Sequence, residues 1–465
     1  MTVRLQQRPA RHSVPIHLTT PAAWAAHAKA LAAPTRRWLA ATGFTAKAGS
    51  HALAAGADGA VAAVWASVAD AADPWLLASL PKALPPGHYH LDPSGDAGLA
   101  ADETAAALSW ELGAYTFDAY RAPARAPAEL SLPPSAAARR GVLLATAIAA
   151  TRDLVNTPAE HMGPAELAEA VRLVAAQHKA KVREVVGDKL LAQGFPAVHA
   201  VGRAAAAARA PRLIELTWGR KGDPLLVLVG KGVCFDSGGL DLKSAEGMRL
   251  MKKDMGGAAH ALGLAQLVMA QALPVRLQLL IPAVENAVSG NAFRPGDIFK
   301  TRAGIAVEIG NTDAEGRVIL CDALAYGAEG KPDLAIDLAT LTGAARTALG
   351  PALPALFCRD TAMAREIVDL GLAERDPLWH MPLWRDYHRL IESDIADIVN
   401  TGKGAMAGAI TAALFLDDFV PASVPWLHLD LFAWNDHARP GRPVGGEAQA
   451  LRTLLSWLEQ RYPRR

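Results

Sequence analysis

Short apolar runs alternate with helix-length segments through the second half of this 465-residue chain, and no other feature constrains its fold as strongly. Residues 225–229 are continuously apolar, which is typical of a strand buried on both faces of a sheet. The alternation continues with strands expected at residues 277–284, 304–309 and 334–338, and with helices expected at residues 256–273 and 316–327. Strands that alternate with helices indicate an α/β sheet with helices on its faces, and sites in such sheets gather in loops after the strands.

The first ~130 residues are rich in alanine and hold no motif to which chemistry can be attached. Residues 60–68 fit either a strand or a helix, because alanine and valine are mixed there without a clear period. Prolines between residues 123 and 134 block a continuous helix and indicate a linker. Ser135 then provides a cap for a helix that runs to about Val155.

Composition narrows the class of protein. The formal net charge of +1 gives no general attraction to nucleic acid or to anionic lipid. Three widely spaced cysteines, Cys234, Cys321 and Cys358, argue against a disulfide framework and fit a reducing compartment. No apolar run reaches the ~20 residues that a bilayer-spanning helix needs, and residues 1–18 lack the apolar core of a secretory signal. We therefore expect a cytoplasmic protein that binds neither membranes nor nucleic acid.

Two clusters of polar residues follow predicted strands and carry the chemistry. The first cluster comes after residues 225–229 and contains Lys231, Asp236, Lys243 and Asp254. The second, at residues 311–317, contains Asp313 and Glu315. Carboxylates in this number supply enough oxygen ligands for two divalent ions. Because Asp313 and Glu315 are two positions apart, we expect their side chains to share one face of an extended segment.

Each cluster has a simpler interpretation when it is taken alone. An isolated Gly-Lys-Gly such as residues 230–232 is usually a turn, and the Lys-Ser/Thr ending of a phosphate loop is missing. The acidic residues at 313–316 also suit the N-terminus of a helix, where carboxylates interact favourably with the dipole. The occurrence of both clusters, in this order and after predicted strands, favours a metal site.

These motifs resemble the leucyl aminopeptidase family, the two-metal cytosolic aminopeptidases. The family signature Asn-Thr-Asp-Ala-Glu-Gly-Arg stands intact at residues 311–317, and the first cluster matches the family pattern at residues 229–239 and 253–255. Further matches lie at residues 156–158, 284–286, 289–291, 294–297, 339–344 and 407–412. The resemblance implies two domains of α/β class. We expect a smaller N-terminal α/β domain at residues 1–132 and a catalytic metallopeptidase domain at residues 133–465, with a mixed sheet and helices on both faces.

The resemblance also implies a set of metal ligands. One metal site would use Asp236, Asp313 and Glu315. The other would use Lys231, Asp236, Asp254 and Glu315, so that Asp236 and Glu315 bridge the two ions. Zinc or manganese is expected, and this mixture of carboxylate and amine ligands also tolerates magnesium or cobalt.

By the same resemblance, Lys243 and Arg317 are catalytic, and a bicarbonate ion on Arg317 is the general base. Four residues match positions near the pocket for the first substrate residue: Met251, Thr340, Leu341 and Gly343. Plain core packing is an equally good interpretation of Met251 and Thr340. His260 and Cys234 are interpreted as packed core residues rather than as ligands.

The implied activity is that of a leucyl aminopeptidase, a metal-dependent enzyme that releases N-terminal residues, preferably leucine-like, from peptides. Two metals ~3.5–4 Å apart would supply a shared water of lowered pKa for attack on the carbonyl. Lys243 would polarise that carbonyl and stabilise the oxyanion. A free substrate amine can ligate one metal, which explains why only the terminal residue is removed. The family assembles as homo-hexamers, and we expect the same here.

The chain departs from the family at two places. Ser244 follows Lys243, where the family usually has proline. After Asp430 the family continues with small residues, whereas this chain reads Leu-Phe-Ala-Trp-Asn at residues 431–435. Because that stretch helps to line the substrate pocket in the family, this departure bears on the side-chain preference.

Two alternative functions compete with this interpretation. Some family members also act as DNA-binding regulators, but near-zero net charge and the lack of a basic patch interleaved with aromatic residues count against that role. An inactive scaffold that keeps only the fold is disfavoured, because every ligand type is present.

Overall fold

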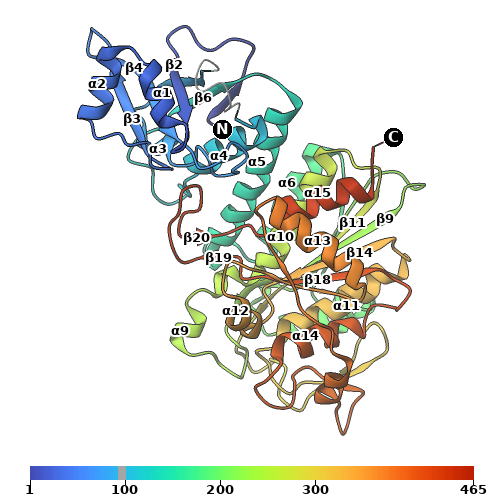
Figure 1. Ribbon diagram of the computed structural model, residues 1–465. Coiled ribbons are helices and arrows are strands. Elements are labelled where there is room, and N and C mark those ends of the chain that lie inside the picture. The colour runs from blue at the N-terminus through green and yellow to red at the C-terminus, as the bar shows by residue number, and fades with distance from the viewer. Residues whose placement is uncertain (93–100, 465) are drawn as a thin grey trace. The chain divides into compact units, whose positions relative to one another are not determined.

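The computed structural model describes residues 1–92 and 101–464, and the chain forms two compact units (Figure 1). One unit comprises Met1–Ala149 with His437–Val444, and the other comprises Ala150–Asp436 with Gly445–Arg465. The division falls inside helix α5 (Ala136–Asn156), which Ser135 caps as expected by accepting a hydrogen bond from Ala138 N. The predicted domain boundary between residues 132 and 133 stays a prediction.

The first unit is built on a six-stranded sheet in the order β1-β6-β5-β2-β4-β3. All neighbouring strands are parallel except β3 and β4. The strands are β1 (Val3–Leu5), β2 (Val14–Thr19), β3 (His51–Ala55), β4 (Val61–Ser67), β5 (His88–Leu91) and β6 (Glu129–Leu132). The helices are α1 (Trp24–Ala30), α2 (Ala33–Ala41), α3 (Leu80–Ala83) and α4 (Glu103–Ala114). Residues 60–68, which fitted either state, contain the strand β4.

The interpretation of residues 123–134 as a linker was wrong in part. Residues 128–132 lie between the prolines and contain none, so their backbone groups are free to pair. Residues 129–132 form β6, which is hydrogen-bonded to both β1 and β5. The core of this unit closes over that sheet, with Ile16, Leu130 and Trp110 fully buried.

The second unit is built on a nine-stranded sheet that mixes parallel and antiparallel neighbours. Its order is β16-β15-β18-β14-β9-β11-β8-β7, and β10 also pairs with β11. Strands β18, β14, β9 and β11 run parallel, β8 is antiparallel to both β11 and β7, and β15 is antiparallel to β18 but parallel to β16. The bounds are β7 (Lys181–Val186), β8 (Arg212–Trp218), β9 (Leu225–Gly230), β10 (Gly232–Asp236), β11 (Arg276–Asn286), β14 (Leu334–Ala339), β15 (Ala355–Cys358), β16 (Trp379–His380) and β18 (Trp426–Asp430). The expected mixed sheet is confirmed.

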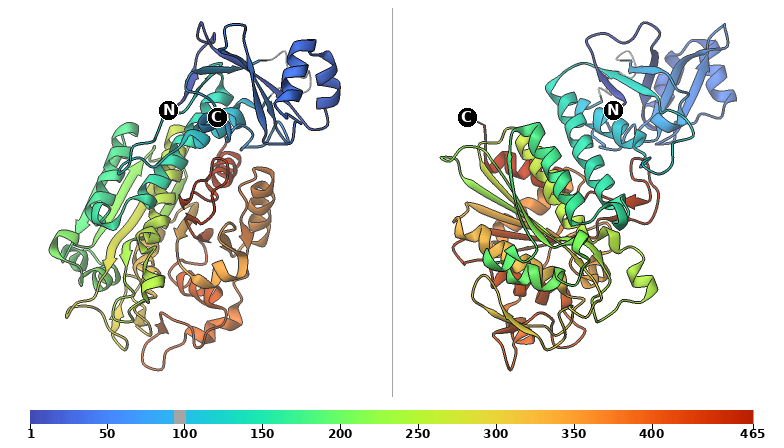
Figure 2. Two further views of the ribbon diagram at one scale, coloured as in Figure 1. Left: turned by 90° about the vertical axis from the view of Figure 1, so that its left-hand side faces the viewer. Right: turned by 180° about the vertical axis from the view of Figure 1, so that it is seen from behind.

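Helices cover both faces of this sheet (Figure 2). Helix α10 (Gly256–Ala270) packs on β9 and β14, and α11 (Glu315–Glu329) packs on β9 and β11. Both helices were predicted, but α10 ends earlier than residue 273 because Ala272 turns to positive φ before Pro274. The remaining helices are α6 (Pro164–His178), α7 (Lys189–Ala192), α8 (Pro196–Gly202), α9 (Ala245–Met248), α12 (Gly343–Leu349), α13 (Thr361–Ala373), α14 (Gly408–Asp417) and α15 (Leu451–Arg461).

The predicted strand at residues 304–309 exists but lies outside the main sheet. It is β13 (Ala306–Glu308), which pairs with β12 (Ile298–Lys300) and β17 (Ile398–Val399) in a separate three-stranded sheet. A tight turn with Gly304 at φ +83° folds β13 back onto β12 as an antiparallel hairpin. Strands β19 (Trp434–Asn435) and β20 (Gly445–Gly446) form a two-stranded sheet.

The three cysteines are buried and free, as expected from their sparse spacing. Among the described residues, no helix has both the length and the apolar character required to cross a membrane.

Helix α10 approaches the sheet so closely that only glycine fits at the contact. A Cβ at Gly257 would lie 2.1 Å from the carbonyl oxygen of Leu338, a backbone atom that cannot rotate away. We predict that Gly257→Ala destabilises the protein by ~1–3 kcal/mol, which exceeds the ~1 kcal/mol that alanine gains over glycine in a helix. The measurement is the midpoint of urea unfolding followed by circular dichroism.

The matched control for this prediction is Gly222→Ala, because a Cβ at Gly222 would meet nothing within 4 Å. That variant should change the free energy of unfolding by less than about 0.5 kcal/mol. Equal urea midpoints for the two variants would contradict the close contact between α10 and β14.

Candidate metal centre

The ends of regular elements bring the predicted ligands together. Lys231 lies between β9 and β10, and Asp236 is the last residue of β10. Asp254 lies in the short 3-10 helix η3 (Met251–Met255), and Glu315 is the first residue of α11. Segments that follow β9, β10 and β13 therefore converge at one place, although β13 belongs to a separate sheet.

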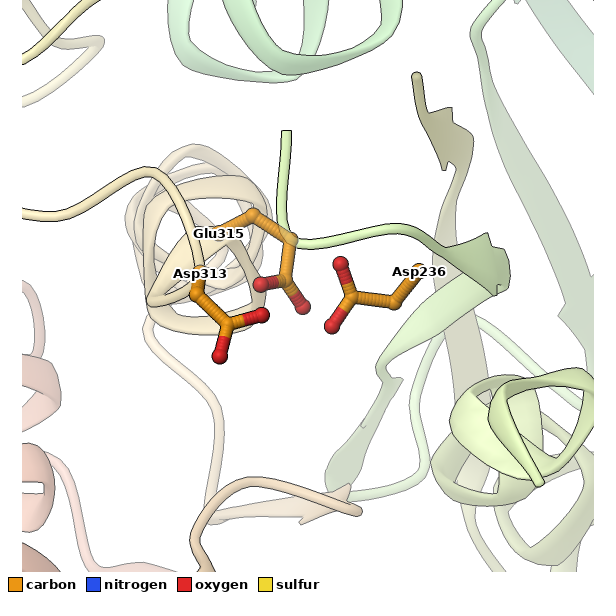
Figure 3. Close-up of side chains that lie close together, drawn as sticks. All are labelled: Asp236, Asp313 and Glu315. Carbon is orange, nitrogen blue, oxygen red and sulfur yellow. The ribbon is translucent and has the colours of Figure 1, made fainter. Parts of the chain in front are cut away.

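Three carboxylates point toward one another (Figure 3). Asp236, Asp313 and Glu315 each offer an oxygen, and these oxygens all lie within 4.8 Å of one another. Asp236 and Glu315 are buried, with 2% and 1% of their surfaces exposed, whereas Asp313 is exposed. Such a group of oxygen ligands matches the preference of hard divalent cations.

The expected extended segment at Asp313 and Glu315 was wrong. Asn311 Oδ1 accepts a hydrogen bond from Asp313 N at 2.7 Å, which folds the chain into a tight turn. Helix α11 then begins at Glu315 itself. The two carboxylates converge because a turn passes directly into a helix, not because they alternate along a strand.

Lys231 joins this group from the other side. Its Nζ lies 2.8 Å from Asp254 Oδ2 and 3.0 Å from Glu315 Oε1, and it donates to the carbonyl oxygen of Thr340 at 2.7 Å. Burial lowers the pKa of Lys231, but the facing carboxylates outweigh that effect and raise the pKa above its ordinary value. The group is therefore strongly anionic and demands positive charge.

Glu315 is the least satisfied of these carboxylates. Burial raises its pKa well above the ordinary value, and the neighbouring charge of Asp236 raises it further. Among the described residues, no hydrogen bond reaches either of its oxygens, and Lys231 approaches only at ion-pair distance. A buried carboxylate with unused lone pairs fits a bound cation, because leaving it unpaired costs free energy.

Lys243 lies on the more open side of the centre. Its Nζ is 2.9 Å from Asp236 Oδ2 and also pairs with Asp313. Burial lowers the pKa of Lys243, but both carboxylates oppose this effect and raise the pKa above its ordinary value. Ser244, which replaces the proline of the family, accepts a hydrogen bond from Gly247 N and caps α9, so Lys243 still directly precedes an ordered turn.

Arg317 follows in the first turn of α11. It is 8% exposed, and burial lowers its pKa to about 10, so it remains charged at neutral pH. Its Nε has no hydrogen-bond partner among the described residues. A buried cation with a free donor fits an anion such as bicarbonate.

The four predicted substrate residues come from two segments. Thr340 Oγ1 donates to Asp254 Oδ1 at 2.9 Å, so this residue contacts a predicted ligand directly. Gly343 opens α12. Met251 opens η3, and Leu341 packs partly against the hydrophobic core. The roles of all four residues stay predictions.

Two further residues that position the centre were not assigned a role from the sequence. Asn286 donates from Nδ2 to Asp236 Oδ1 at 2.8 Å, which orients that carboxylate. Asp430 Oδ1 accepts from Leu341 N at 3.0 Å and from Thr342 N at 3.1 Å, which fixes the loop before α12. The match at residues 284–286 was a signal for Asn286, but its partner depends on the pairing of β10 with β11.

His260 and Cys234 are packed in the core, as expected. His260 is fully buried, and its Nδ1 lies 2.6 Å from the carbonyl oxygen of Gly256 while its Nε2 accepts from Gln449 N. Burial lowers the pKa of His260 to about 4, which keeps the ring neutral. Burial raises the pKa of Cys234 well above its ordinary value, so the thiolate that would bind a metal is disfavoured.

Comparison with known proteins decides the family. A model of the cytosol aminopeptidase family, catalytic domain, matches residues 149–455, and a model of the M17 aminopeptidase, N-terminal domain, matches residues 14–133. The chain belongs to the cytosol aminopeptidase family. The resemblance seen in the sequence is thereby confirmed, as is the two-domain α/β fold class.

Individual relatives agree with this membership. A probable cytosol aminopeptidase of Syntrophotalea carbinolica is 44% identical over 330 residues, which cover 70% of this chain and 66% of the relative. The chain thus aligns with about two thirds of the length of such curated relatives. The 1.8 Å crystal structure of a cytosol aminopeptidase from Coxiella burnetii superposes with a TM-score of 0.93 at 48% identity and covers 99% of both chains.

A second solved structure bears on the metal. The bottromycin maturation enzyme BotP, solved in complex with Mn, superposes with a TM-score of 0.86 at 35% identity, over 97% of this chain and 99% of that chain. None of these relatives supports the DNA-binding alternative.

Glu315 provides the sharpest test of the centre. We predict that Glu315→Gln, which keeps the shape and removes the charge, lowers bound metal by roughly half or more, because this residue is expected to bridge two ions. Metal content is measured by mass spectrometry after dialysis. Glu215→Gln is the control, since Glu215 lies on β8 and bonds Gln278 and Tyr326 instead. Full metal content in Glu315→Gln would contradict the proposed centre.

Proposed function

We propose that this chain is a metal-dependent aminopeptidase that releases N-terminal residues, preferably leucine-like, from peptides with a free N-terminus. The observation that carries the proposal is the convergence of Asp236, Asp313 and Glu315, with the amine of Lys231 and the carboxylate of Asp254 beside them. Family membership supports this activity. Hydrolysis of leucine p-nitroanilide tests it directly.

Asp236, Asp313 and Glu315 would hold one divalent ion, and Lys231, Asp236, Asp254 and Glu315 would hold the other. When bound, the ions polarise the scissile carbonyl and lower the pKa of a shared water into the neutral range. Zinc or manganese suits these ligands, with magnesium or cobalt as further candidates. The manganese complex of BotP supports manganese in particular.

The two lysines serve opposite protonation states. Lys231 can be a ligand only as a neutral amine, so a cation must replace the proton that the facing carboxylates favour. Lys243 must stay charged to polarise the carbonyl and to stabilise the developing oxyanion. Its contacts with Asp236 and Asp313, which raise its pKa, support that role.

Arg317 would hold bicarbonate, which supplies a general base when it is bound. The buried, charged guanidinium with an unpartnered Nε supports this assignment. Met251, Thr340, Leu341 and Gly343 would contact the first substrate residue, and the hydrogen bond from Thr340 to Asp254 supports a place for Thr340 at the centre.

The wider organisation is also proposed. The family-model matches at residues 14–133 and 149–455 support an N-terminal domain at residues 1–132 and a catalytic domain at residues 133–465. A homo-hexamer follows from the family resemblance. The names of the curated relatives support a cytoplasmic location.

Hydrolysis should require both bound metal and a free N-terminal amine on the substrate. A strong chelator should abolish hydrolysis of leucine p-nitroanilide, and Mn²⁺ or Zn²⁺ should restore it, because the bound ions supply the Lewis acid. A peptide with N-terminal leucine should be cut, whereas its N-acetylated form should be nearly inert. Full activity after metal removal, or equal kcat/KM for the two peptides, would refute the mechanism.

The roles of the lysines are separable by matched substitutions. Lys231→Met should lower metal content, because it removes a ligand. Lys243→Met should keep the metal and lower kcat by roughly a hundredfold or more, as expected for loss of an oxyanion donor. Metal stoichiometry and kcat are measured for both variants. Loss of metal in Lys243→Met with retention in Lys231→Met would mean that the two roles are reversed.

A further inference from the structure

Two cations and an aromatic ring form a cluster that the proposed mechanism does not use. Lys253 Nζ lies 4.8 Å from the centroid of the Phe432 ring, and Arg346 Cζ also lies 4.8 Å from it. We call Lys253, Arg346 and Phe432 the cationic cluster. An aromatic ring that contacts two cations attracts each through its negative faces, but the two positive charges repel each other.

The cationic cluster is formed by the same segments that carry the predicted substrate residues. Lys253 lies in η3, two positions after Met251 and directly before Asp254. Arg346 lies in the first turn of α12, and a Cβ at Gly343 would be 4.0 Å from Arg346 Nη2. The guanidinium therefore folds back beside a predicted substrate position.

Phe432 completes the cluster from a third segment. It follows β18 by two positions, in the stretch at residues 431–435 where the family has small residues. A large ring at such a position leaves less room for an aliphatic side chain. It also offers a flat apolar surface between two charged groups.

Neither cation has a carboxylate partner at ion-pair distance within the described part of the chain, although Arg346 is exposed to solvent. Lys253 is only 6% exposed, yet no hydrogen bond or ion pair from the described residues reaches its ammonium group. Arg346 also has no carboxylate within ion-pair distance among these residues. The nearby carboxylate Asp430 is committed to the backbone of Leu341 and Thr342. A largely buried ammonium group that lies against a ring face, without a hydrogen bond or an ion pair from the described residues, fits an anionic ligand.

We propose that the pocket for the N-terminal residue also accepts an acidic side chain, with the carboxylate of Asp or Glu bound by Lys253 and Arg346. The aliphatic part of that side chain would pack on Phe432, which is compatible with leucine as a second substrate. This inference rests on the proposed aminopeptidase function and adds a substrate class to it.

Three p-nitroanilides test the inference, namely those of glutamate, glutamine and leucine. Glutamate and glutamine have the same shape, so these two substrates differ only in the charge of the side chain. None of the three substrates has a C-terminal carboxylate that could bind the cations instead. At neutral pH we expect kcat/KM for glutamate to exceed that for glutamine by about tenfold, as a charge-assisted hydrogen bond provides. Equal or lower values for glutamate, with leucine cut, would overturn the inference alone. If leucine itself is not cut, the proposed function fails, and this inference fails with it.

Substitutions in the cationic cluster test whether it causes the preference for glutamate over glutamine. Arg346→Gln and Lys253→Met should each bring the glutamate-to-glutamine ratio close to one, while Arg346→Lys should retain most of it. The ratio is internal to each variant, so a general loss of activity cancels. Arg346 is exposed, which keeps this test available even if the buried Lys253 cannot be replaced. Lys221→Met, at an exposed turn, is the control and should keep the wild-type ratio. An unchanged ratio in both Arg346→Gln and Lys253→Met would refute the assignment.

Discussion

The burial of carboxylates beside lysine ammonium groups is the interaction on which the rest of the site depends. Each buried carboxylate must be compensated by a charge or by hydrogen bonds, or the fold loses several kcal/mol of stability. Asp236 accepts hydrogen bonds from Gly238 N and Asn286 Nδ2 and forms an ion pair with Lys243. Asp254 accepts a hydrogen bond from Thr340 Oγ1 and forms an ion pair with Lys231. Among the residues that the structure describes, only Lys231 approaches Glu315 closely, and no hydrogen bond reaches its carboxylate. The surrounding loops thus hold a charge distribution that is balanced except at the point where a cation would bind.

Much of the fold could be predicted because strands buried on both faces leave a strong trace in the sequence. The run at residues 225–229 is apolar throughout, and it became β9 at the middle of the main sheet. Pairing between distant segments leaves no such trace. The segment that forms β6 was interpreted as part of a linker because prolines flank it, and nothing nearby in the sequence indicates its pairing with β1 and β5. Similarly, β13 was predicted as a strand, but the turn at Gly304 placed it in another sheet.

The candidate site could likewise be predicted only where local sequence determines it. The residue types and the signature at residues 311–317 predicted the ligand set. Spacing alone gave the wrong geometry for Asp313 and Glu315, because the start of α11 depends on a local turn at Asn311. Asn286 and Asp430 received no role because their contacts depend on how β10 aligns with β11 and where β18 ends. Register of this kind is set by tertiary packing, which a single sequence does not contain.

The separation of Phe432 from the ligand-bearing elements has a consequence for how such enzymes diverge. Asp236, Asp254 and Glu315 belong to β10, η3 and α11, whose ends are fixed by the core, whereas Phe432 lies in the irregular segment after β18. Exchange of side chains in that segment leaves the ligand-bearing elements in place. Substitutions at a few positions of this irregular segment can therefore change which N-terminal side chains are accepted, while the arrangement of the ligands stays the same.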